Sequence, residues 1–363
     1  PLRDMSTGRL RALAEFRHNL GSQHNTCFIN GDFMDDGLLG LVREINRAVQ
    51  QGDGTVAWYG EEYPVSDGQG GIDYSLVQKM AVHPIFNSVT IHEVGHTLGL
   101  RHNFAGSYDS LNYHRRYWEL RNDGNMQPRA WDPMTENEID NRIREFQYSS
   151  VMDYGHNHVV TNAWGIGHYD RAAIKMGYGD LVEVFTEVPD ESKLDVAVMA
   201  TQRVTGFPWV LDLSNPFILR FIPYTEIPQL VGGLDDQGSG RPRVEALEAR
   251  EDVRYTSLTD IANNILQLEV EEARTMDAQG RPTVPYIYCG DEFADIEPRC
   301  LRWDAGADEY ETLMSIMDSY WNYYIYNSFM RQRIGFDSYD TPVAIYRRYL
   351  QKLQAANFIY TFF

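Results

Sequence analysis

Residues 91–104 read IHEVGHTLGLRHNF, and the spacing of their histidines constrains the chain more than any other feature. His92 and His96 are four residues apart, so on an α-helix their side chains project from the same face, one turn apart. Two imidazoles arranged in this way can bind a single metal ion. We therefore expect a metal-binding helix that ends at Gly99.

A third ligand is predicted beyond the end of this helix. His102 lies six residues after His96, where a straight helix would carry it away from the metal. Gly99 can adopt a positive φ and turn the chain sharply, which would bring His102 back toward the other two histidines. Three histidines with a fourth position left for water are typical of a catalytic zinc site. We predict one catalytic Zn²⁺ bound by His92, His96 and His102.

Glu93 has a chemical role in this interpretation. It lies next to His92, close enough to act as a general base toward the hydrolytic water without binding the metal. The sequence thus predicts a zinc-dependent endopeptidase that uses a zinc-activated water, with Glu93 as its base. The alternative is a zinc-containing binding or scaffold module with little or no turnover, although a purely structural site would not need Glu93.

The remaining histidines are less informative. We expect five of them to be surface or core residues and not ligands: His18, His24, His83, His114 and His168. His156 and His158 follow in GHNHVV, where they either line the substrate cleft or belong to an ordinary loop.

The pattern formed by His92, Glu93, His96, Gly99 and His102 resembles the long zinc motif of the metzincin metallopeptidases. The signature of that family continues with a methionine in a tight turn. The segment SSVMDYG, residues 149–155, supplies such a methionine. The resemblance implies a metzincin-like catalytic domain that acts on protein or peptide substrates.

The resemblance also implies roles for two residues of this turn. The metzincin methionine lies beneath the zinc site as a hydrophobic base, so Met152 would be a structural support and not a ligand. Tyr154 stands two residues later, as in astacin-like and serralysin-like members. There a tyrosine approaches the zinc and hydrogen-bonds the oxyanion, whereas the alternative is a packed tyrosine whose hydroxyl bonds elsewhere.

A closer resemblance is to a family of bacterial secreted zinc-dependent metallopeptidases. It implies a secreted or extracytoplasmic location, in the periplasm or at the cell surface. The resemblance extends from residue 91 to about residue 306, and the similar segments are HEVGHTLGLRHNFAGS, SVMDYG, GHYDRAAIKMGYG and YCGDEF with PRCLRWDAG.

The last of these segments contains two cysteines. Cys289 and Cys300 either form a disulfide or are reduced core residues, and Cys27 has no obvious partner. The acidic residues around the two cysteines either bind Ca²⁺ or form an acidic loop closed by the disulfide. These residues are Asp291, Glu292, Asp295 and Glu297.

The sequence predicts an α+β fold. Residues 1–180 are expected to form the metzincin-like catalytic domain, and residues 181–363 a mixed, then mainly helical, C-terminal region packed on it. Pro84 is expected to end one helix, and Asn87 or Ser88 to cap the metal-binding helix. Other helices are predicted near residues 7–20, 37–49, 167–179 and 258–276, with strands at TVAWY and LVEVF. An aromatic stripe late in the chain is expected to pack in the core: Tyr320, Trp321, Tyr324 and Phe329.

The first 90 residues contain fewer strand signals than a metzincin sheet requires. The missing strands either lie in NTCFING and GTVAWYGEEY or precede Pro1. The chain opens at PLRDMSTGRL, with neither an initiator methionine nor a signal peptide, so we expect a processed or excised piece.

Composition excludes some classes of partner. The chain has 363 residues, a formal net charge of −20 and a pI near 4.8, which disfavours binding to nucleic acid. No run approaches the roughly 18 apolar residues that a membrane span needs. The oligomeric state is not predicted from these features.

Overall fold

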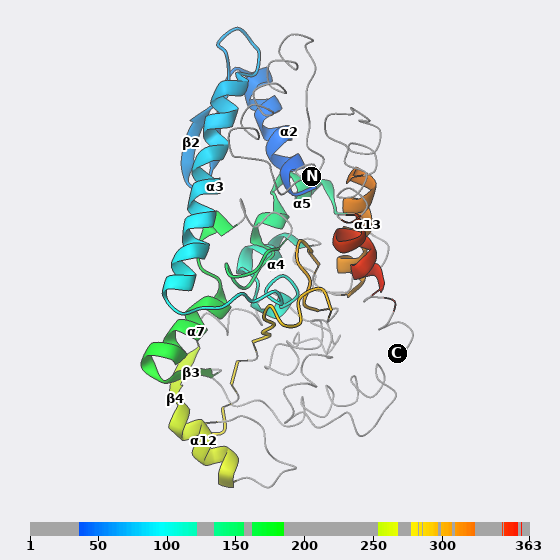
Figure 1. Cartoon of the computed structure of the whole chain (residues 1–363). Coiled ribbons are helices and arrows are strands. Elements are labelled where there is room, and N and C mark those ends of the chain that lie inside the picture. Colours follow the sequence, from blue (N-terminus) through cyan, green and yellow to red (C-terminus); the bar gives the residue numbers. More distant parts are fainter. Residues whose placement is uncertain are drawn as a thin grey trace, which may run out of the picture.

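The computed structural model describes residues 36–121, 134–155, 162–184 and 253–267, and, with short gaps, 277–323 and 343–357. The described residues form helices and two small antiparallel sheets, so the fold is mixed α+β (Figure 1). None of the described helices combines the length and apolar character needed to cross a membrane. The predicted helix at residues 7–20 and the segment NTCFING lie outside the described residues.

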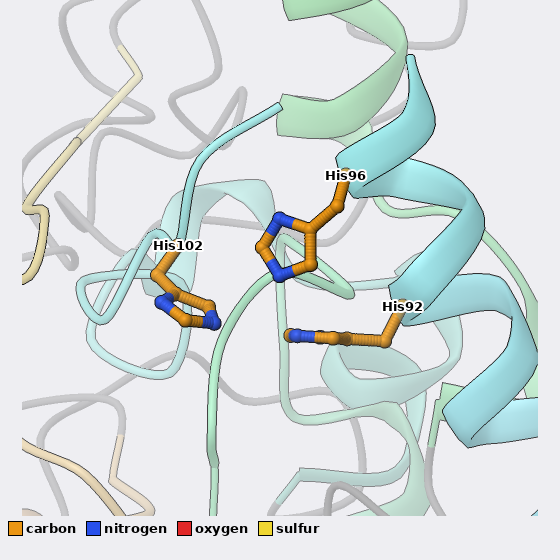
Figure 2. Close-up of side chains that lie close together, drawn as sticks. All are labelled: His92, His96 and His102. Carbon is orange, nitrogen blue, oxygen red and sulfur yellow. The ribbon is translucent and has the colours of Figure 1, made fainter. Parts of the chain in front are cut away.

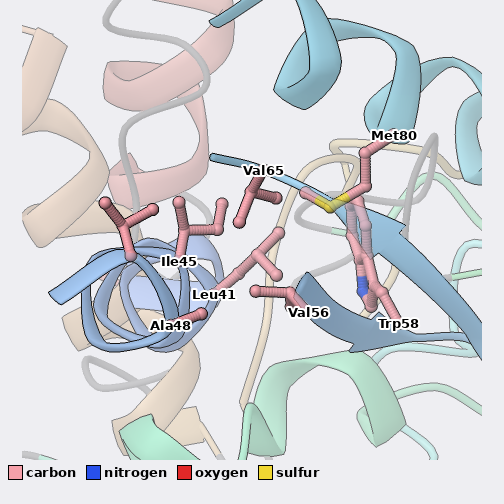
Figure 3. Packing of buried hydrophobic residues seen from close by; sticks show 8 residues of the cluster. Leu41, Ile45, Ala48, Val56, Trp58, Val65 and Met80 are labelled. Carbon is pink, nitrogen blue, oxygen red and sulfur yellow. The ribbon is translucent and has the colours of Figure 1, made fainter. Parts of the chain in front are cut away.

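The first core lies between helix α2 (Asp36–Gln51), a hairpin and helix α3 (Tyr74–Thr97) (Figure 3). The apolar residues of α2 recur at helical intervals and face strand β1 (Thr55–Trp58). The buried side chains of this cluster are Leu41, Ile45, Ala48, Val49, Val56, Trp58, Val65 and Met80. The predicted helix at residues 37–49 and the strand at TVAWY are thereby confirmed.

The hairpin joins β1 to strand β2 (Glu61–Pro64), with Trp58 opposite Glu61. Its two-residue loop, Tyr59 and Gly60, has φ values of 50° and 81°, the pair of positive angles that a type I′ turn requires. The segment GTVAWYGEEY therefore does contain strands. They form a two-stranded sheet.

Helix α3 differs from the prediction that Pro84 ends one helix and that Asn87 or Ser88 caps the next. The structure has a single helix of 24 residues that continues through Pro84, and Asp73 caps its start by accepting hydrogen bonds from Ser75 N and Leu76 N. A proline inside a helix removes one backbone hydrogen bond and costs about 3 kcal/mol. Tertiary packing offsets this cost, because the buried face of α3 includes Pro84 together with Met80, Ser88, His92 and Gly95. Asn87 bonds His83 and caps nothing.

A second core forms where the chain leaves the metal-binding segment. It is built by 3₁₀-helix η3 (Ser110–Asn112), helix α4 (Arg115–Leu120) and 3₁₀-helix η5 (Ile143–Phe146). Helix α5 (Glu136–Asp140), which precedes η5, packs against α2. Thr135 and Glu138 form a capping box at the start of α5. The buried apolar residues here are Tyr113, Tyr117, Trp118, Leu120 and Ile143.

The lower part of the structure in Figure 1 contains helix α7 (His168–Gly179), strands β3 (Leu181–Val184) and β4 (Arg254–Ser257), and helix α12 (Leu258–Gln267). The preceding 3₁₀-helix η6 (Asn162–Trp164) packs against α3. The two strands pair in an antiparallel sheet. Helix α7 ends at Gly179, but the left-handed residue after it is Asp180, with φ 50°. The left-handed position that ends this helix is therefore occupied by an aspartate, one of the few residue types besides glycine that adopt it.

The C-terminal part contains helix α13 (Glu309–Tyr323) and the π-helical turn η10 (Tyr346–Leu350). Leu301, Ile316 and Tyr349 form a buried cluster against which Tyr320 packs. Trp321 is 54% exposed, so the core prediction for the aromatic stripe is wrong at this residue. Tyr324 and Phe329 lie outside the described residues.

Residues late in the chain contact the second core directly. Ser107 Oγ donates to Asp304 at 2.9 Å, and Tyr113 OH donates to the carbonyl of Gly306 at 3.0 Å. Arg121 forms a buried ion pair with Glu311 of α13. These contacts connect the segment after His102 to residues 304–311. The proposed division at residue 180 stays a prediction.

His114, at the start of α4, makes the stability of this core sensitive to pH. Burial lowers the pKa of His114 to about 4, and the charge of Arg171 contributes in the same direction. Because the folded pKa lies below the unfolded value, stability is complete above about pH 6.5 and falls as the pH drops toward 4. We expect zinc-free protein to lose about 2 kcal/mol of unfolding free energy through this group between pH 7 and pH 5.

Urea unfolding at both pH values measures this effect. His114→Phe keeps a ring against Tyr148, whose ring centroid lies 4.7 Å away, but cannot titrate. The loss of unfolding free energy between pH 7 and pH 5 should therefore be smaller by about 2 kcal/mol in the variant than in the wild type. An equal loss in the two proteins would show that His114 is not the titrating group.

Candidate metal centre

The end of α3 brings the three histidines together. Leu98 ends the helix, and Gly99 follows with φ +85°. Gly99 N donates to His96 O at 3.0 Å and Leu100 N donates to Gly95 O at 3.1 Å, the two hydrogen bonds of a Schellman motif. This turn reverses the chain so that His102 faces the helix it has left.

The ring nitrogens of His92, His96 and His102 converge (Figure 2). One ligand atom from each residue lies within 4.8 Å of the other two. No other group of three histidine, cysteine or acidic residues with this geometry occurs in the part of the chain that the structure describes. The structure thus brings together the three predicted ligands.

Each imidazole is oriented by a hydrogen bond from its Nδ1. His92 Nδ1 donates to Val151 O at 2.7 Å, and His96 Nδ1 donates to Leu100 O at 3.0 Å. His102 Nδ1 donates to the Asp291 carboxylate at 3.0 and 3.1 Å. Because carbonyl and carboxylate oxygens only accept, these bonds place the proton on Nδ1 and leave the Nε2 lone pair of each ring for a metal.

The burial of His92 supports the same conclusion. His92 is 4% exposed, and its Nε2 has no hydrogen-bond partner among the described residues. Burial lowers the pKa of His92, and the neighbouring His96 and His102 also lower it. A neutral imidazole with an unsatisfied buried nitrogen is what a zinc ligand requires, so the residues present fit the ion.

Met152 packs against α3 at Gly95, between His92 and His96 in the sequence. It is completely buried with Tyr148 and Val151, and Ile91 and Leu100 pack against the same cluster. Its sulfur contacts α3 at Gly95, where an added Cβ would overlap it. A glycine between His92 and His96 therefore allows the methionine to approach the helix backbone.

Replacement of Gly95 tests this contact. Gly95→Ala should lower the unfolding free energy by about 1–3 kcal/mol, because the methyl group overpacks against Met152. Gly177→Ala is the matched control, since Gly177 lies in α7 and a Cβ there meets nothing within 4 Å. This control should be neutral or stabilising by about 0.5–1 kcal/mol. Thermal or urea unfolding compares the two, and equal effects would contradict the packing argument.

Asp170 organises the turn that carries Met152. Its carboxylate accepts from Ser150 Oγ at 2.7 Å and from the backbone N–H groups of Val151 and Gly167, both at 2.8 Å. Burial raises the pKa of Asp170 to about 6, and the hydrogen bonds to Val151, Ser150 and Gly167 partly oppose this shift. The sequence segment GHYDRAAIKMGYG suggested no such role, because the contact joins two segments about 20 residues apart.

Glu93 and Tyr154 neighbour the histidine group, since Glu93 follows His92 on α3 and the Tyr154 ring centroid lies 4.9 Å from that of His102. Glu93 is exposed on α3, and Tyr154 OH donates to His102 Nε2 at 3.0 Å. Burial raises the pKa of Tyr154, with the negative charge of Glu93 as the second cause. Tyr154 thus contacts the nitrogen that would bind the metal, within electrostatic range of Glu93.

The disulfide between Cys289 and Cys300 is present, which resolves the alternative of two reduced cysteines. Three of the acidic residues beside the disulfide each pair with a different side chain, and these pairings do not support a Ca²⁺ site. Asp291 accepts from His102, Glu292 pairs with Arg101, and Asp295 pairs with Arg302 at 2.9 Å. Glu297 lies outside the described residues.

The other described histidines lie outside the group. His83 is exposed and bonds Tyr63 OH at 2.9 Å and Asn87 at 3.0 Å. His114 and His168 lie near each other, with ring centroids 6.4 Å apart. Four others fall outside the described residues: His18, His24, His156 and His158.

Comparison with known proteins supports the metzincin resemblance. Residues 77–117 match a family model described as Met-zincin. The matched segment covers most of α3, the turn at Gly99 and His102, so the similarity to the Met-zincin family includes all three histidines of the group. No curated protein and no solved structure matches the chain. The more specific resemblance to one bacterial secreted family is not confirmed by these comparisons.

Proposed function

We propose that this protein is a zinc-dependent endopeptidase of the metzincin type. The observation that carries the proposal is the hydrogen bonding of the three histidines. Each Nδ1 donates to a protein oxygen, so three Nε2 atoms are left to converge on one position, and one of them is buried without a partner. The match of residues 77–117 to a Met-zincin family supports the assignment of peptide substrates.

His92, His96 and His102 would hold the ion. When bound, zinc supplies a Lewis acid that polarises the scissile carbonyl and lowers the pKa of a water to about 7. Glu93 accepts the proton that this water loses as its oxygen attacks the carbonyl carbon. Glu93 then passes that proton to the amine nitrogen as the carbon–nitrogen bond breaks. The exposed position of Glu93 leaves its carboxylate accessible to substrate.

Tyr154 stabilises the oxyanion that forms during the attack. Its hydroxyl donates to His102 Nε2 in the structure. His102 would hold the ion through this nitrogen, so with the ion bound the hydroxyl could donate to the oxyanion instead. A donor directed at developing negative charge strengthens as the charge grows, and so lowers the barrier.

Tyr154→Phe tests this role. The variant keeps the ring that packs against Phe104 but loses the hydroxyl. We expect kcat to fall by about 100-fold while zinc affinity stays the same or rises, because a competing hydrogen bond to His102 is removed. Steady-state kinetics and a zinc titration measure both quantities. An unchanged kcat would show that the hydroxyl has only a packing role.

A secreted or extracytoplasmic location is part of the proposal. The disulfide between Cys289 and Cys300 supports it, because disulfides persist mainly in oxidising compartments. The family resemblance of the sequence points the same way. Fractionation of cells that make the protein, with detection in culture medium and periplasm, checks this assignment.

The test of the proposed function is cleavage of a mixed peptide library read by mass spectrometry. We expect cuts by the zinc-loaded protein that disappear after chelation and return when zinc is added back. The same library reveals the side-chain preference around the cleaved bond. If the loaded protein leaves the library intact, a zinc-containing binding module replaces the endopeptidase as the better account.

A further inference from the structure

His102 differs from the other two ligands in the way it is held. His92 and His96 lie on α3, and each donates its Nδ1 proton to a backbone carbonyl. His102 lies past the end of the helix and donates to Asp291, a residue 189 positions away. The third ligand therefore depends on a distant segment of the chain for its orientation.

We propose that Asp291 is a positioning residue of the metal centre, and that the Cys289–Cys300 disulfide acts on zinc affinity by holding Asp291 against His102. The inference rests on the proposed function, since it concerns the same three ligands. It adds a fourth protein group to the site and makes zinc affinity depend on the oxidation state of two cysteines.

The two residues that follow His102 are hydrogen-bonded to the segment that carries Asp291. Phe104 N donates to Cys289 O at 2.8 Å, and Cys289 N donates to Asn103 Oδ1 at 3.0 Å. Asn103 Nδ2 donates to Ile287 O at 3.1 Å. These three hydrogen bonds fix the chain at residues 287–289, two residues before Asp291.

The disulfide fixes the other end of the same loop. Cys289 and Cys300 are buried, and Asp295 N donates to Cys300 O at 2.7 Å. Asp291 therefore lies in a short loop with both ends tied. Opening the disulfide removes the covalent connection between residues 289 and 300, so the Asp291 carboxylate gains conformational freedom that it must lose again when it bonds His102.

The carboxylate affects zinc through the imidazole. An Nδ1–H bonded to a carboxylate fixes the tautomer and ring orientation and makes Nε2 more basic. Asp291 is a stronger acceptor than the carbonyls that orient His92 and His96, because its bond is charge-assisted. This difference suits a ligand on a loop, where no helix geometry fixes the ring.

The experiment measures zinc dissociation constants by competition with a chelating dye, which requires no activity. Asp291→Ala should bind zinc about 10- to 100-fold more weakly than wild type, and Asp291→Asn, which keeps a neutral acceptor, should lose less. The matched control is Glu292→Gln, which removes the charge of the neighbouring carboxylate. Glu292 forms an exposed ion pair with Arg101. This control should stay within about twofold, because exposed ion pairs contribute little.

A double-mutant cycle tests the link to the disulfide. Replacing both cysteines by serine should weaken zinc binding of the otherwise unchanged chain, by less than Asp291→Ala does. In the Asp291→Ala background the same replacement should cost no further zinc affinity, since the disulfide acts through Asp291. Equal losses in both backgrounds would overturn the link. Circular dichroism of the zinc-free variants confirms that each one folds.

The outcomes separate this inference from the proposed function. If wild type binds zinc and cleaves peptides while Asp291→Ala binds zinc equally well, only the role of Asp291 is refuted. If wild type takes up no zinc, both proposals fail. Weaker binding in Asp291→Ala and in Glu292→Gln alike would also overturn the inference, because it would indicate a general effect of negative charge.

Discussion

Glu93→Gln is expected to retain zinc and to lose about 10²- to 10⁴-fold in kcat, the range that a positioned general base contributes. In the proposed site the three histidines would bind the metal, and Glu93 makes no contact needed to orient them, since each Nδ1 donates to another residue. Glutamine has nearly the same shape but cannot accept the proton of water. The loss should therefore appear in the chemical step and not in folding.

The measurement is kcat and KM on one peptide identified from the library, with zinc content determined for each preparation. Glu62→Gln is the control, because it removes an exposed carboxylate on β2, away from the histidine group. It should leave kcat unchanged. A Glu93→Gln enzyme with full activity at equal zinc content would exclude Glu93 as the base.

His96→Ala is expected to weaken zinc binding on the order of 100-fold, so that a weak chelator removes the metal and activity is lost with it. Four-ligand zinc sites bind with about 10–16 kcal/mol, so one ligand accounts for roughly 3 kcal/mol, or on the order of 100-fold in affinity. His96 is only half-buried, so its removal should leave the fold intact. The loss of activity follows from the loss of metal.

His83→Ala is the matched control, because His83 lies on the same helix and bonds only residues outside the site. Zinc content by elemental analysis after dialysis against a weak chelator distinguishes the two variants. We expect about one zinc per chain in the control and almost none in His96→Ala. Zinc retained by His96→Ala would place the metal elsewhere.

The sequence predicted the parts of this site that depend on local spacing. His92 and His96 share a helix face because of their four-residue interval, and Gly99 turns the chain because it alone tolerates φ +85° without strain. The methionine turn was found because its residues are contiguous. In each case the information lies within a few residues of the side chain concerned.

Two features were outside the reach of local reasoning. Pro84 was expected to break α3, but packing of its buried face against the core outweighs the lost hydrogen bond. Asp291 and Asp170 support His102 and Met152 across separations of 189 and about 20 residues, and no local pattern encodes such contacts. From the sequence alone, Asp291 was expected either to bind Ca²⁺ or to belong to an acidic loop closed by the disulfide, whereas the structure gives it a histidine partner.

The measurement that tests the central claim most directly is zinc-edge X-ray absorption on the zinc-loaded protein. We expect one zinc per chain with three imidazole nitrogens at about 2.0–2.1 Å and one oxygen ligand. The imidazole signal should drop to two rings in any His102→Ala protein that still holds metal. Sulfur ligands, or fewer than three imidazoles in the wild type, would contradict a catalytic centre built from His92, His96 and His102.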